Sequence, residues 1–127
     1  MTLVLATGGL GFIGSHTCVS LIENGFDVLI LDSLENSSED IFYKIQEITN
    51  HKINVNCGKL FFINCDISDE IYLEEIFHDF YKNKNPIESV IHFAGLKSVE
   101  ESVRDPLKYW DINLRCTINL LRVMRKY

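Results

Sequence analysis

The chain has 127 residues, a length that suits one compact domain and is too short for two. Hydrophobic residues make up 46% of it and charged residues 24%, values close to the globular average that argue against a disordered chain. The formal net charge of −6, from 18 acidic and 12 basic residues, argues against a nucleic-acid partner, because such a partner calls for a basic face.

The first predicted unit is a strand, a turn, a helix and a second strand. A short apolar run at 3–6 has the pattern of a strand that is covered on both faces. Glycines follow, then apolar residues recur at helical spacing over 13–22, and Gly25 ends this helix. A second apolar run at 28–31 ends on Asp32. The order predicts one βαβ unit with glycines at its turn.

The rest of the chain continues the alternation of helices and strands. The predicted segments are, in order, a polar turn at 33–38, a helix at 41–49, a polar connection at 50–59, a strand at 60–63, a helix at 71–80, a loop at 83–86, a strand at 89–93 and a helix from 106 to the C-terminus. The last helix carries one apolar stripe, made of Leu107, Trp110, Leu114, Ile118 and Leu121.

Four apolar strands that alternate with helices predict a parallel sheet with right-handed crossovers. The predicted fold class is α/β, a Rossmann-type doubly wound sheet with its strands in the order 3-2-1-4. Because the full order of such a fold is 3-2-1-4-5-6, residues 1–127 are expected to form its N-terminal portion.

The four cysteines, Cys18, Cys57, Cys65 and Cys116, form no Cys-x-x-Cys pair and are joined by no His-x₃₋₅-His, so no metal site is expected. The N-terminal residues lack the basic flank and the apolar length of a signal peptide. No stretch approaches the ~20 apolar residues that span a bilayer. We therefore expect a cytoplasmic protein with free thiols and no membrane contact.

The turn after the first strand carries regularly spaced glycines. Gly8, Gly11 and Gly14 form Gly-x-x-Gly-x-x-Gly, and Gly9 adds a Gly-x-Gly-x-x-Gly pattern. In dinucleotide-binding folds such glycines permit a tight turn, let the main chain approach a pyrophosphate and let the helix pack closely on the strand. The pyrophosphate then rests on the helix N-terminus. A P-loop would need Gly-Lys-Ser/Thr, which is absent, and a methyltransferase-type turn usually spaces its glycines differently.

Asp32 ends the second strand, the place of the acidic residue in dinucleotide-binding folds. A carboxylate there accepts hydrogen bonds from the adenosine ribose hydroxyls and repels the 2′-phosphate of NADP. Ser33 follows, and the nearest arginine in sequence is Arg104, so no neighbouring cation is available to hold that phosphate. NAD is therefore the predicted cofactor. The alternative for Asp32 is a solvated aspartate at the end of a strand.

Longer stretches of the chain resemble one family. Residues 8–18 (GGLGFIGSHTC), 31–37 (LDSLENS), 65–67 (CDI) and 90–99 (VIHFAGLKSV) are together similar to the UDP-glucose 4-epimerases, which are extended short-chain dehydrogenases/reductases. The resemblance covers the whole chain and is weakest at 38–59. Related dehydratases and decarboxylases share the glycine turn but usually differ at residues 91–103 (IHFAGLKSVEESV).

The resemblance implies a binding site for NAD along the ends of the strands. The implied cofactor-binding residues are Gly8, Gly11, Phe12, Ile13 and Gly14 at the pyrophosphate, Asp32, Ser33, Asn36 and Ser37 at the adenosine ribose, Asp66 and Ile67 at the adenine, Phe93, Ala94 and Gly95 along the cofactor, and Lys97 and Asn113 at the nicotinamide end. His16 and His92 are expected to be structural.

The resemblance also implies a reaction and its partners. In this family a hydride passes from C4 of a UDP-hexose to NAD, with a tyrosine as base, aided by a lysine four positions later and a serine. No tyrosine of this chain has a lysine at that spacing, so no catalytic residue is assigned. We expect residues 1–127 to be the NAD-binding domain, truncated before the catalytic pair and the UDP-sugar-binding region, and inactive alone.

Alternatives remain for the activity. The chain could serve another NAD-dependent sugar-nucleotide enzyme, such as a 4,6-dehydratase or a glucuronate epimerase, or it could be a non-catalytic NAD-binding module. Family members commonly dimerise through helices, so a homodimer that uses the last helix is expected. The fourth strand has no fifth strand beside it, and such an open apolar edge favours self-association.

Overall fold

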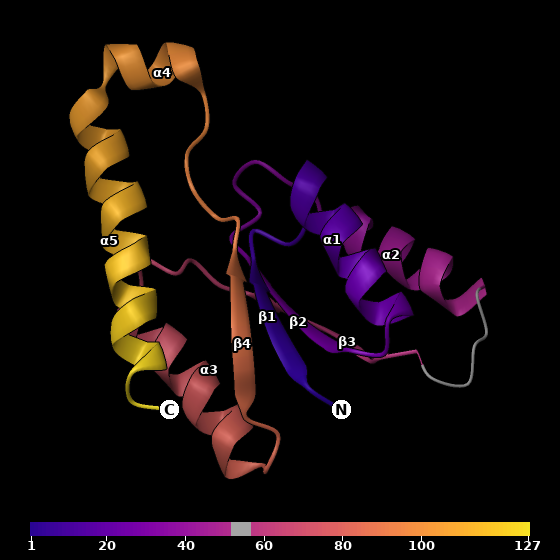
Figure 1. Ribbon diagram of the computed structural model, residues 1–127. Helices are drawn as coiled ribbons and strands as arrows, with labels where there is room; N and C mark the ends of the chain where they lie inside the picture. Colours follow the sequence, from indigo (N-terminus) through magenta and orange to yellow (C-terminus); the bar gives the residue numbers. More distant parts are fainter. Residues whose placement is uncertain (52–56) are drawn as a thin grey trace.

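The computed structural model describes residues 1–51 and 57–127. Strands and helices alternate as predicted up to the last strand, after which two helices follow in succession, and the N-terminus lies at the foot of the central sheet (Figure 1). The elements are β1 (Leu3–Thr7), α1 (Phe12–Glu23), β2 (Asp27–Asp32), α2 (Asp40–His51), β3 (Leu60–Asn64), α3 (Glu70–Lys82), β4 (Ile87–His92), α4 (Val99–Arg104) and α5 (Pro106–Met124). Of the polar connection predicted at 50–59, residues 52–56 lie outside the described residues.

The four strands form one parallel sheet in the order β3-β2-β1-β4, which confirms the predicted order. Leu5 of β1 lies opposite Leu29 of β2 on one side and Val90 of β4 on the other. Every residue of β1 and β2 is buried, because helices cover both faces of the sheet at its centre. The predicted Rossmann-type α/β fold class is confirmed.

Side chains of each strand alternate between two cores, one on each face of the sheet. Leu5 and Leu29 belong to the core that packs against α3 and α5, whereas Ala6 and Ile30 belong to the core that packs against α1 and α2. Figure 1 shows the same two layers, with α1 and α2 on one side of the sheet and α3 and α5 on the other. The carboxyl ends of the strands all point to one edge, where the glycine turn begins.

The last third of the chain differs from the sequence prediction in two respects. A short helix, α4, occupies Val99–Arg104, where no helix was predicted. The apolar stripe predicted on the last helix does not enter the core: Trp110 is 70% exposed, and Leu107, Leu114, Ile118 and Leu121 are exposed as well. The face of α5 that packs against the core instead carries Cys116, Leu120 and Val123.

The sheet ends at β4, whose outer edge pairs with no further strand in the described part of the chain. The middle of β4 is correspondingly more exposed than β1 or β2. Helix α5 lies alongside this open edge and packs on α3 and α4 (Figure 1). Across residues 1–51 and 57–127, no helix combines the length and the apolar character that crossing a membrane requires.

Candidate functional site

A hollow of about 500 Å³ lies where the strands end at the carboxyl edge of the sheet. Its walls come from the glycine turn after β1, the loops after β2 and β3, and the loop between β4 and α4. The predicted cofactor residues that line it are Gly8, Gly11, Phe12, Ile13, Asp32, Ser33, Asn36, Ser37, Asp66, Ile67, Phe93, Ala94, Gly95 and Lys97. The fold therefore brings together residues from four separate loops, at the edge where doubly wound sheets bind ligands.

The glycine turn is tight because neighbouring main chain occupies the space where side chains would lie. Gly8 has a φ of +67°, and a Cβ on it would lie 2.7 Å from the amide nitrogen of Ala94. A Cβ on Gly14 would lie 2.4 Å from the carbonyl oxygen of Gly8, so α1 seats directly on the turn. Gly14 does not line the hollow; it lets α1 pack closely on the turn that follows β1.

Gly11 lies on the open side of the turn. A Cβ there would meet the Gly8 carbonyl oxygen at 3.3 Å and no other atom in contact range. Gly11 is the N-cap of α1, where no side chain caps the helix and the first turn carries no acidic residue. The first N–H groups of a helix have no partner within it, so this end offers donors and a positive dipole to an anion. Phe12 and Ile13, both exposed, flank these donors.

Asp32 connects the glycine turn to the loop after β2. Its Oδ2 accepts from the Leu10 N–H at 3.1 Å, and its Oδ1 accepts from the Leu34 N–H at 3.0 Å and from the Ser37 hydroxyl at 2.7 Å. The residue is only 8% exposed, so the alternative of a solvated aspartate is wrong. A carboxylate has about four acceptor positions, and three are filled, which leaves one on Oδ2 for a ligand hydroxyl.

The adenine-side residues follow β3. Asp66 is exposed and its Oδ1 accepts from the Ser68 N–H at 2.9 Å, which fixes the turn, whereas Ile67 is buried with 4% exposure. Two cysteines, Cys65 and Cys116, complete this wall of the hollow. Burial raises the pKa of the Cys65 thiol to about 12 and raises that of Cys116, so both present neutral thiols.

His92, at the end of β4, joins β1 to α5. The Thr7 hydroxyl is 2.5 Å from His92 Nδ1, and His92 Nε2 is 3.3 Å from the Thr117 hydroxyl. The Thr117 hydroxyl donates to the Asn113 carbonyl, so it must accept from Nε2–H, and Nδ1 in turn accepts from Thr7. Burial, and after it the charge of Lys97, lower the pKa of His92. This neutral, fully hydrogen-bonded imidazole suits the structural role that the sequence predicted.

Lys97 and Asn113 differ in what they contact. Lys97 lines the hollow, and no hydrogen bond or ion pair within the described residues involves its ammonium group. Asn113 does not line the hollow: its Oδ1 accepts from the Leu96 N–H at 2.8 Å and its Nδ2 donates to the Leu96 carbonyl at 3.1 Å. In this structure Asn113 therefore holds the loop that carries Lys97.

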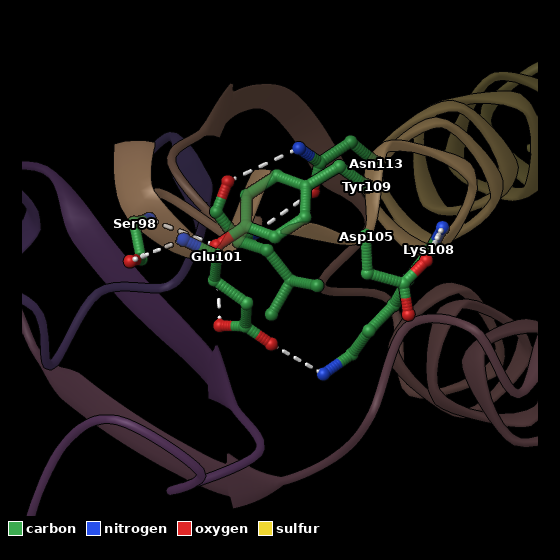
Figure 2. A network of polar contacts seen from close by, with 7 residues as sticks. Ser98, Glu101, Asp105, Lys108, Tyr109 and Asn113 are labelled. Carbon is green, nitrogen blue, oxygen red and sulfur yellow. Dashed lines mark hydrogen bonds and ion pairs between the residues drawn. The ribbon is translucent and has the colours of Figure 1, made fainter. Parts of the chain in front are cut away.

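Besides Glu35, in the loop after β2, the hollow has three polar lining residues that the sequence did not predict, Ser98, Glu101 and Tyr109. They come from the unpredicted helix α4 and from the first turns of α5 (Figure 2). Ser98-x-x-Glu101 is the pattern of a capping box, a signal in the sequence that predicts a helix start at this point. Lys97 is the one basic residue among the described residues that line the hollow, and no metal-binding group of three ligands occurs within that part of the chain.

Comparisons with known proteins find relatives over nearly the whole chain. Residues 5–127 match the family described as GDP-mannose 4,6 dehydratase. The chain is 47% identical over 124 residues to a UDP-glucose 4-epimerase of Schizosaccharomyces pombe, covering 98% of this chain and 32% of that protein. It is 46% identical over 122 residues to one from Klebsiella pneumoniae, covering 96% of this chain and 79% of that sequence.

Solved structures are similar over the same length. A UDP-glucose 4-epimerase from Bifidobacterium longum, in complex with NAD+ and UDP, superposes with a TM-score of 0.84 at 41% identity, covering 98% of this chain and 34% of that chain. One from Stenotrophomonas maltophila, with bound NAD and formylated UDP-arabinopyranose, also gives a TM-score of 0.84, at 38% identity. Apart from the Klebsiella sequence, the chain spans about a third of the relatives named here.

Proposed function

The chain belongs to the UDP-glucose 4-epimerase family, and from this premise we propose that it binds NAD in the hollow at the carboxyl edge of the sheet. The observation that carries the proposal is Asp32, which lines the hollow with three acceptor positions filled from within the protein and one left over. A ribose hydroxyl is a donor of the right kind for that remaining position. The 2′-phosphate of NADP would face a fixed carboxylate there.

The other residues of the hollow fit the remaining parts of the same molecule. The uncapped N-terminus of α1, reached across Gly11, suits a pyrophosphate. Ser37 holds the Asp32 carboxylate in place, and Asp66 is free to accept from an adenine amine with the oxygen that Ser68 does not use. Lys97 would hold the nicotinamide ribose. Bound NAD would supply a hydride acceptor for chemistry on a sugar.

For the whole protein we propose the interconversion of UDP-glucose and UDP-galactose through a 4-keto intermediate. The support is the identity of the relatives, of which this chain spans about a third. Residues 1–127 contain no Tyr-x-x-x-Lys, so in this proposal they form the NAD-binding domain, and the UDP-hexose and the catalytic base are bound elsewhere in the protein. The chain by itself is expected to be inactive.

Two further features belong to this proposal. The exposed stripe of α5 is the surface that we propose for pairing two copies of the protein, because an apolar helix face of this length is a poor surface to leave in water.

A 4,6-dehydratase is the second candidate activity, since the matching family description is that of GDP-mannose 4,6 dehydratase. Assay of the whole protein on UDP-glucose and on GDP-mannose distinguishes the two.

Calorimetric titration of the 127-residue chain with NAD and with NADP tests the binding proposal. We expect NAD to bind and NADP to bind at least about tenfold more weakly, because the 2′-phosphate would lie against the Asp32 carboxylate. Asp79→Asn, an exposed change on α3, is the matched control and should leave both titrations unchanged. Equal affinity for the two dinucleotides, or binding of neither, would refute the proposal. Conversion of UDP-galactose by the chain above a blank without protein would refute its expected inactivity.

A further inference from the structure

The loop that carries Lys97 is attached to α5 on both sides of that residue. Before it, the main chain of Leu96 makes two hydrogen bonds with the side chain of Asn113. After it, the Ser98 N–H donates to the Tyr109 hydroxyl at 2.9 Å. Tyr109 and Asn113 are four residues apart and so lie on one face of α5. The helix therefore fixes the main chain on each side of Lys97.

The Tyr109 hydroxyl occupies an unusual position within the N-terminal cap of α4. Ser98 caps α4, with its Oγ accepting from the Glu101 N–H at 3.2 Å. In a capping box the glutamate accepts directly from the N–H of the capping residue. Here the tyrosine hydroxyl stands between the two partners, because it accepts from the Ser98 N–H and donates to Glu101 Oε2 at 3.3 Å (Figure 2).

The direction of these hydrogen bonds is set by Glu101 and its second partner. Lys108 Nζ lies 2.5 Å from Glu101 Oε1, and this hydrogen bond is the main reason that the pKa of Glu101 is lowered. The carboxylate thus stays ionised and can only accept, which forces the Tyr109 proton toward it and leaves the hydroxyl oxygen for Ser98. Hydrogen bonds linked in this way strengthen one another.

The start of α5 is fixed as well. Asp105 caps this helix, with Oδ1 accepting from the Lys108 N–H at 3.2 Å, and Pro106 occupies its first turn. Lys108 and Tyr109 follow within that turn, so the helix cap determines where their side chains emerge (Figure 2). Ser98, Glu101 and Tyr109 all line the hollow, next to Lys97.

We propose that Tyr109, oriented by Glu101, is a positioning residue that holds the Lys97 loop in its binding conformation before the cofactor arrives. The inference rests on the proposed NAD-binding function. Its physical basis is that a loop ordered in advance loses less conformational freedom on binding, so more of the contact made by Lys97 appears as affinity. Tyr109 would act through Lys97, and its effect would be confined to the nicotinamide end of the site.

Titrations of the 127-residue chain with NAD and with ADP separate this role from the adenosine site. ADP carries the adenosine and the pyrophosphate and has no nicotinamide ribose. Tyr109→Phe removes the hydroxyl and with it the hydrogen bond that holds Ser98 to α5. We expect the loss of that bond to weaken NAD binding roughly three- to tenfold and to leave ADP binding unchanged. Tyr43→Phe, an exposed tyrosine on α2 that does not line the hollow, is the matched control and should change neither.

A double-mutant cycle with Lys97→Met tests whether Tyr109 acts through the lysine. In the Lys97→Met background, Tyr109→Phe should cost no further NAD affinity, because the group that the loop presents is gone. The fluorescence of bound NADH reports on the nicotinamide environment. Tyr109→Phe should change it in the unaltered chain and should cause no further change in the Lys97→Met background. Glu101→Gln keeps an acceptor for Tyr109 but loses the ion pair, so we expect a smaller loss of NAD affinity than for Tyr109→Phe.

Several outcomes would overturn the inference. It fails if Tyr109→Phe leaves NAD binding unchanged, weakens NAD and ADP alike, or keeps its full effect in the Lys97→Met background. If Tyr109→Phe fails to fold, an unchanged NAD affinity of Glu101→Gln overturns it instead. If the unaltered chain binds NAD no more tightly than ADP, the inference fails, whereas the proposed adenosine site still stands. If the unaltered chain binds neither nucleotide, the proposed function itself fails, and the inference fails with it.

Discussion

Asp32 should contribute to the stability of the chain even when no nucleotide is present. Its carboxylate accepts three hydrogen bonds, from Leu10, Leu34 and Ser37, in a position that is 8% exposed. In Asp32→Asn the amide oxygen can still accept from Leu34 and Ser37, but the amide NH₂ then faces the Leu10 N–H, donor against donor. One bond to a charged acceptor is lost and two are weakened, so we expect the free energy of unfolding to fall by about 2–4 kcal/mol.

Urea unfolding followed by far-UV circular dichroism, without added nucleotide, measures this change. Asp79→Asn on the exposed surface of α3 is the control and should stay within about 0.5 kcal/mol of the unaltered chain. An Asp32→Asn chain as stable as this control would refute the reasoning, because it would mean that the three donors find other partners. The same variant should bind NADP relatively better than the unaltered chain does, since the repelling charge is gone.

Three further predictions concern the turn, the histidine and the outer helix. Gly11→Ala should keep the free energy of unfolding within about 1 kcal/mol of the unaltered chain but weaken NAD binding at least about tenfold, because its Cβ would lie 3.3 Å from the Gly8 oxygen on the side that opens to the pyrophosphate. In Gly14→Ala the Cβ would lie 2.4 Å from the same oxygen, so urea unfolding should show a loss of about 1–3 kcal/mol. Equal stability of the two variants would contradict this expectation. Burial lowers the pKa of His92 from 6.5, so as the pH falls the unfolded chain takes up that proton before the folded chain does. The free energy of unfolding should therefore fall as the pH drops below 6.5. In His92→Gln the dependence of the unfolding free energy on pH should be correspondingly weaker, and an unchanged dependence would show that other groups cause it. Leu114→Glu, a change in the exposed stripe of α5, should lower the mass measured by sedimentation equilibrium toward that of a monomer, and an unchanged mass would exclude the stripe as the pairing surface.

Much of the fold could be predicted from the sequence because its strands are short apolar runs and its turns are marked by glycine or aspartate. The runs that became β1 and β2 are buried on both faces, and only a parallel sheet with helices on both sides covers such strands. Helix α4 was not predicted because it is only six residues long, and its two apolar residues, Val99 and Val103, are exposed and join no core. Only its cap, Ser98 with Glu101, distinguishes it from a loop.

The sequence by itself determined the local conformations: the glycine turn, the acidic end of β2 and the order of strands and helices all follow from residue types at short spacing. It also placed the hollow, because parallel strands deliver the residues that follow them to one edge. The tertiary structure decided which partners the polar groups take. That Asp32 accepts from Leu10, and that Tyr109 connects Ser98 to Glu101, depends on how separate elements pack. A side chain satisfies its hydrogen bonds with whatever the fold brings within about 3 Å, and chain spacing alone does not specify that neighbour.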